Sequence, residues 1–96
     1  MVATDLSKCV WVFVGDGAHF PCGAFVDFAS ADQAARRNKL SGVLTAYPLD
    51  ILVYDWAVAN SSFRPTEERH SSPKYIQQFT SAVLEHYHYH EGERDG

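Results

Sequence analysis

Three histidines near the C-terminus are the side chains best suited to chemistry. His86, His88 and His90 alternate with tyrosines in the run HYHYH. If the run is helical, His86 and His90 lie four residues apart on one face and can bind one divalent ion. If it is extended, all three imidazoles point the same way. Either arrangement offers ligands to a metal such as Zn²⁺. In the alternative interpretation the run is the polar end of a helix, where the histidines interact with the helix dipole and bind no metal.

A second candidate group surrounds a Tyr-Pro-Leu-Asp turn within residues 41–60 and combines aromatic rings with carboxylates: Tyr47, Asp50, Tyr54, Asp55 and Trp56. Asp50 is predicted to form the turn. In an extended segment Tyr54 and Trp56 share one face and Asp55 points to the other. A buried Asp55 would be a site residue, because burial raises the pKa of a carboxyl group. We predict a binding role for this group and for Phe63, the expected anchor of the polar loop that follows.

No combination of residues predicts an enzyme. Asp16, His19 and Cys22 resemble a nucleophile set in residue type, but their spacing of three does not place them on one face of a strand. The metalloprotease pattern H-E-x-x-H and the glycine spacing of phosphate loops are both absent from the sequence. We therefore assign no catalytic residue and expect no cofactor, unless the histidines bind a metal.

Length and composition indicate one globular domain. The chain has 96 residues, of which 46% are hydrophobic and 21% charged. The domain is predicted to cover residues 1–96, with a core over about 8–91 and flexible ends at 1–7 and 92–96. The formal net charge is −4, and the basic residues gather only at Arg36, Arg37 and Lys39. This is a small solvated cluster rather than a phosphate footprint, so nucleic-acid binding is not expected.

The cellular compartment follows from what the sequence lacks. No apolar stretch approaches the roughly 20 residues of a membrane span, and the N-terminal residues do not have the pattern of a signal peptide. Cys9 and Cys22 match no zinc-binding spacing. We predict a cytoplasmic protein with reduced thiols and no membrane association.

Hydrophobic patterning predicts an α+β fold with the order β-β-α-β-β-α. The expected elements are strands over 8–15 and 19–28 (firm over 23–28), a helix over 30–38, a hairpin of strands over 43–47 and 51–59, and a helix that begins at Ser72-Pro73 and fades around residues 86–91. The last helix has an apolar stripe of Tyr75, Ile76, Phe79, Val83, Leu84 and Tyr87. We expect a two-layer sandwich, with a four-stranded, mainly antiparallel sheet and two helices on one face.

The chain resembles a small bacterial domain family of unknown function over about residues 10–92. The resemblance is carried by the motifs W-V-F-x-G from Trp11, L-S-G-V-L-T-x-Y-P-x-D from Leu40, Y-D-W-A from Tyr54 and H-x-H-Y from His86. The chain departs from the family pattern at Val14, where a polar residue is typical. The resemblance implies one complete domain and assigns no activity.

The uncovered face of such a sheet suggests a function. Aromatic residues make up 14% of the chain, and alternate residues of the strands would present several of them with valines to solvent. An exposed apolar sheet face marks a partner site in a soluble protein. The sequence therefore predicts a non-enzymatic protein–protein interaction module, either a homodimer or the immunity or regulatory partner of another protein. The alternative is a metal- or small-ligand-binding domain that uses the histidine cluster together with residues of the loop 60–72, such as Glu67 and His70.

Overall fold

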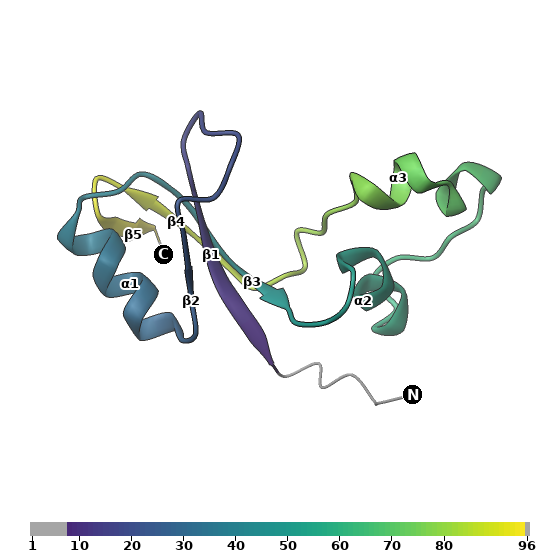
Figure 1. Ribbon diagram of the computed structural model, residues 1–96, viewed down its shortest axis with the longest axis horizontal. Coiled ribbons are helices and arrows are strands. Elements are labelled where there is room, and N and C mark those ends of the chain that lie inside the picture. The colour runs from purple at the N-terminus through teal and green to yellow at the C-terminus, as the bar shows by residue number, and fades with distance from the viewer. Residues whose placement is uncertain (1–7, 96) are drawn as a thin grey trace.

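Within residues 8–95 the protein forms an antiparallel sheet of five strands, in the order β2-β1-β3-β4-β5. A computed structural model describes residues 8–95 (Figure 1). The strands are β1 (Cys9–Gly15), β2 (Gly23–Phe25), β3 (Gly42–Pro48), β4 (His86–His90) and β5 (Glu93–Asp95). The helices are α1 (Phe28–Arg37), α2 (Val53–Ala59), the 3₁₀ helix η1 (Glu68–Ser71) and α3 (Pro73–Gln77). Figure 1 shows α1 against the sheet, with α2 and α3 beyond the end of β3.

The predicted α+β class and the antiparallel sheet are confirmed, but the predicted four strands and their order are wrong. Residues 51–59 were expected to be a strand and instead contain α2. Asp50 has a left-handed backbone, with φ of 60°, at the turn that follows β3. The buried residues of α2, Tyr54 and Ala57, are three apart, which is the spacing of one helix face. Packing of that face outweighs the strand preference of the Val, Ile, Tyr and Trp residues.

The last predicted helix begins where expected but is far shorter. Ser72 caps α3 by accepting a hydrogen bond from the N–H of Tyr75 at 3.2 Å, and Pro73 is the first helical residue. The helix ends at Gln77, so the predicted apolar stripe through Tyr87 does not exist as a helix face. Residues 86–90 form β4 instead, because β3 supplies backbone partners there. Tyr87 and Tyr89 both point toward the core and alternate with the exposed histidines.

Helix α1 begins earlier than the sequence suggested. Its N-cap is Asp27 rather than Ser30, and Asp27 accepts a hydrogen bond from the Ser30 N–H at 2.7 Å. The hydrogen bond holds the pKa of Asp27 below its usual value, because it stabilises the charged carboxylate. Ala31 and Ala35 are the fully buried residues of the helix, and their small side chains let α1 lie close to the sheet.

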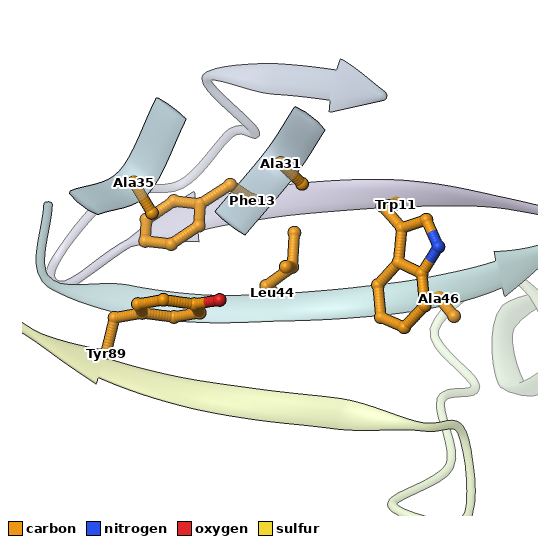
Figure 2. Close-up of a cluster of buried hydrophobic side chains, with 7 residues drawn as sticks. All are labelled: Trp11, Phe13, Ala31, Ala35, Leu44, Ala46 and Tyr89. Atoms are coloured by element: carbon orange, nitrogen blue, oxygen red, sulfur yellow. The ribbon is translucent and has the colours of Figure 1, made fainter. Parts of the chain in front are cut away.

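The core lies between α1 and one face of the sheet (Figure 2). Trp11 and Phe13 come from β1, Leu44 and Ala46 from β3, and Tyr89 from β4. The two residues from β1 are two apart, as are the two from β3, so both members of each pair point to the same side of the strand. Their partners on α1 are Ala31 and Ala35.

The C-terminal residues are part of the sheet rather than a flexible tail. Residues 92–95, predicted to be flexible, form a tight turn and strand β5, whereas residues 1–7 lie outside the described residues. The Gly92 N–H donates to the Leu40 carbonyl at 2.9 Å, which ties the β4–β5 turn to the end of α1. Gly92 has φ of 84°, and a Cβ there would lie 3.0 Å from the Arg36 carbonyl oxygen, so this turn requires glycine.

Candidate functional site

The face of the sheet opposite α1 changes in side-chain chemistry from one strand to the next, and we call it the open face. It consists of the residues of β1, β3 and β4 that alternate with the core residues: Val10, Val12, Val14, Val43, Thr45, Tyr47, His86, His88 and His90. The β1 and β3 members are partly exposed, and the three histidines are exposed. Strand pairing aligns Val12 with Thr45 and Thr45 with His86. The face therefore changes from valine at β1 to imidazole at β4.

The histidine row lies along β4, so the extended alternative is correct and the helical pairing of His86 with His90 is wrong. The rings of His86 and His88 have centroids 5.4 Å apart. Strand pairing places Asp95 opposite His88 and Glu93 opposite His90. Among residues 8–95, no group of three or more His, Cys, Asp or Glu side chains is gathered closely enough to hold a metal ion.

The core side of β4 fixes the position of the histidine row. The Tyr89 hydroxyl donates a hydrogen bond to Asp32 of α1 at 2.6 Å. Burial raises the pKa of Asp32, but the hydrogen bonds from Tyr89 and Arg36 outweigh it, so this pKa lies below its usual value. Burial and the hydrogen bond to Asp32 both raise the pKa of Tyr89. The Arg94 guanidinium of β5 lies 4.9 Å from the ring centroid of Tyr87 and adds a cation–π contact.

The residues predicted around the central turn do not form one group. Tyr47 belongs to the open face, and Asp50 is exposed in the turn that follows β3. Tyr54, Asp55 and Trp56 all lie on α2. The predicted common face of Tyr54 and Trp56 is wrong, because residues two apart on a helix differ in direction by about 200°. Asp55 is exposed in the first turn of α2, so it is not the buried carboxylate that the site hypothesis required.

Tyr54 and Phe63 do meet, within an aromatic cluster that links the short helices: Tyr54, Phe63, His70, Tyr75 and Phe79. The ring centroids of Tyr54 and Phe63 are 5.7 Å apart, and those of Phe63 and Phe79 are 4.8 Å apart. Arg69 lies 5.4 Å from the ring centroid of Tyr75. The cluster packs the helices together, so the structure gives Phe63 the anchoring position expected from the sequence.

His70, which the sequence offered with Glu67 as a candidate ligand residue of the polar loop, lies within this cluster. It is buried, and its Nδ1 accepts hydrogen bonds from the N–H groups of Thr66 at 3.0 Å and Glu67 at 3.1 Å. An Nδ1 with two N–H donors carries no proton of its own. His70 therefore orders the loop before η1. The sequence did not indicate that His70 is buried or that it accepts these two hydrogen bonds.

The fold and the open face define a small α+β domain with one sheet face covered by a helix. The chain belongs to the family described as Domain of unknown function (DUF7710), whose model matches residues 10–95. This confirms the predicted resemblance to a family of unknown function. No curated protein matches the chain, and no solved structure does. Within residues 8–95, every helix is too short or too polar to cross a membrane.

Proposed function

We propose that the protein is a non-enzymatic protein–protein interaction module that pairs through its open face. The observation that carries this proposal is the row of Val10, Val12 and Val14 beside Val43, all outside the buried core. A β-branched row on one side of a sheet is what a second layer normally covers. Here α1 covers the other side.

A second copy of the chain is the occupant that we favour. Two open faces stacked about a two-fold axis would bring the valines of β1 and β3 together at the centre. The histidines of β4 and the carboxylates Glu93 and Asp95 of β5 would then form a polar rim, as interfaces commonly have. A different protein, for which this chain is the immunity or regulatory partner, would use the same face. We place the module in the cytoplasm, without nucleic acid or membrane as partner.

Native mass spectrometry of the untagged protein, purified from its own host without a nickel column, tests this proposal. We expect a species at twice the 10.8 kDa monomer mass. A complex with a second polypeptide would still support an interaction module, but its partner would be a different protein and not a second copy of the chain. A bare monomer at every concentration would contradict stable pairing through this face.

The histidine row supports a second candidate function, the binding of a divalent metal such as Zn²⁺. His86 and His88 project from the same face with ring centroids 5.4 Å apart, and imidazole is a common zinc ligand. Calorimetric titration with zinc tests this function in wild type, the double variant His86→Gln with His88→Gln, and His19→Gln as control. Binding that the double variant loses and the control keeps is the expected result. Equal binding by all three proteins, or none by wild type, would reject the site.

A further inference from the structure

The outer edge of β2 is only three residues long, and no charged side chain of its own protects it. β2 pairs with β1 on one side, and its other edge has no strand partner within the part of the chain that the structure describes. Residues 17–26 include no Asp, Glu, Lys or Arg. Val26 directly follows the strand and is 90% exposed, and Phe20, in the loop three residues before the strand, is 78% exposed. Soluble proteins normally place charges at such edges, because open edges recruit other strands.

A cavity lies beside this edge, between β2 and α1. Its volume is about 190 Å³. The lining is largely apolar and comes from β1, β2, α1 and the turn after α1, including Phe13, Gly23, Phe25, Ala34, Asn38 and Leu40. A cavity of about 150 Å³ in a protein core holds benzene. The cavity beside β2 therefore has room for one aromatic or branched aliphatic side chain.

Small residues explain why this space is open. On this side α1 contributes only the small side chains of Ala31, Ala34 and Ala35. A Cβ on Gly23 would lie 3.0 Å from the ring of Phe25, so this ring already fills the place of the missing side chain. The unfilled volume lies between that ring and the helix.

The edge and the cavity together fit an extended peptide. A strand added to a sheet lies about 4.8 Å from its neighbour, and alternate side chains point to the same face. On a strand paired with β2, the side chains on the α1 side would pass beneath the helix next to Gly23. Main-chain hydrogen bonds then provide affinity, and the cavity provides specificity for one side chain.

Charge at the end of α1 indicates what flanks that side chain. Arg37 and Lys39 are the neighbours of Asn38, which lines the cavity, and both are exposed. Neither forms an ion pair with an acidic side chain of residues 8–95. Acidic residues beside the apolar side chain would complement them. A second copy pairing through β2 would bring no acidic side chain from residues 17–26, since its nearest carboxylates are Asp16 and Asp27 at the two margins of that segment.

We infer that the free edge of β2 and the cavity beneath α1 bind an extended segment of another protein. The segment adds a strand next to β2, inserts one aromatic or branched aliphatic side chain into the cavity, and carries acidic residues beside it. This site lies on the α1 side of the sheet and does not depend on pairing through the open face.

A phage-displayed library of random linear peptides tests this inference, with the full chain as target. Wild type is compared with Ala34→Leu, which fills the cavity from α1, and with Ala29→Leu, the same change at an exposed position of that helix. We expect wild type and Ala29→Leu to enrich peptides in which an apolar residue has acidic neighbours. A synthetic peptide of the enriched sequence should lose at least about tenfold in affinity with Ala34→Leu. It should also slow amide hydrogen exchange in β2.

A second variant and the possible negative results decide the test even if Ala34→Leu does not fold. The double variant Arg37→Glu with Lys39→Glu leaves the cavity intact and should weaken the same peptide, so it substitutes for Ala34→Leu if that variant does not fold. No enrichment over background would overturn the inference, and so would protection on β4 rather than β2. If wild type self-associates and Ala34→Leu abolishes that self-association, the site binds a second copy of the chain, and the inferred partner protein is wrong.

Discussion

The two halves of the molecule are stabilised in different ways. In the half made of α1 and the sheet, Leu44 is 0% exposed and Phe13 2% exposed, and strand pairing runs through all five strands. The helical segment, residues 49–83 between β3 and β4, has helices of seven, four and five residues. Helices this short are not stable alone. The comparison indicates that the sheet half forms one cooperative core, whereas the helical segment depends on the aromatic cluster and on His70.

The largest effect is expected from Leu44→Ala in the sheet core. Leu44 is fully buried between Phe13, Tyr89 and α1, so truncation leaves a cavity and should lower the free energy of unfolding by about 2–5 kcal/mol. Urea denaturation followed by circular dichroism measures this loss. Leu52→Ala is the control, because Leu52 is 56% exposed and its loss should stay within about 0.5 kcal/mol. A similar loss of unfolding free energy in both variants would contradict the assignment of Leu44 to the core and of Leu52 to the surface.

His70→Ala should destabilise the helical segment and leave the sheet folded. The variant removes the acceptor of the Thr66 and Glu67 N–H groups, at a cost of about 1–3 kcal/mol. Amide hydrogen exchange should accelerate over residues 63–79 and stay unchanged in β1 and β3. His70→Asn is the matched control, since its side-chain oxygen can accept in place of Nδ1. Faster exchange throughout the sheet would show that the two halves unfold as one unit.

Much of the sheet half could be predicted from the sequence. The β-branched and aromatic runs of residues 8–15 and 43–47 predicted β1 and β3, but a continuous apolar run such as 9–14 does not show which side chains face the core, because the packing of α1 decides it. The run HYHYH was ambiguous between helix and strand, because pairing with β3 decides its conformation. Residues 51–59 have strand-like composition, yet the packing of Tyr54 and Ala57 makes them helical. The role of His70 arises from loop backbone geometry, which the sequence does not display.

Tyr89→Phe probes the link between α1 and β4 within the sheet half. Loss of the hydrogen bond to Asp32 should cost about 0.5–3 kcal/mol near pH 7. The pKa of Asp32 lies below its usual value of about 3.9, so its contribution is complete above that value and is lost as pH falls through the lower, folded-state pKa. The raised pKa of Tyr89 gives a contribution that is complete below pH of about 10 and is lost at higher pH. Urea titrations across pH should show that the difference between wild type and variant shrinks at both extremes. A difference independent of pH would contradict the assigned hydrogen bond.

The smallest effect is expected from Ser72→Ala at the start of α3. Losing this N-cap should cost about 1 kcal/mol, felt as faster amide exchange in α3 alone. Ser72→Thr retains a hydroxyl and is the control. If Ser72→Ala also speeds exchange in β4, the helical segment is coupled to the sheet more strongly than the comparison implies.

The central claim is that the open face pairs with a second copy, and sedimentation velocity over a range of concentrations tests it most directly. Val12 is the middle residue of the β1 valine row on this face, whereas Ala29 is exposed on α1, so Val12→Lys and Ala29→Lys form a matched pair. We predict that wild type and Ala29→Lys sediment as dimers and that Val12→Lys sediments as a folded monomer. Monomeric wild type throughout, or a dimer that survives Val12→Lys, would contradict the account.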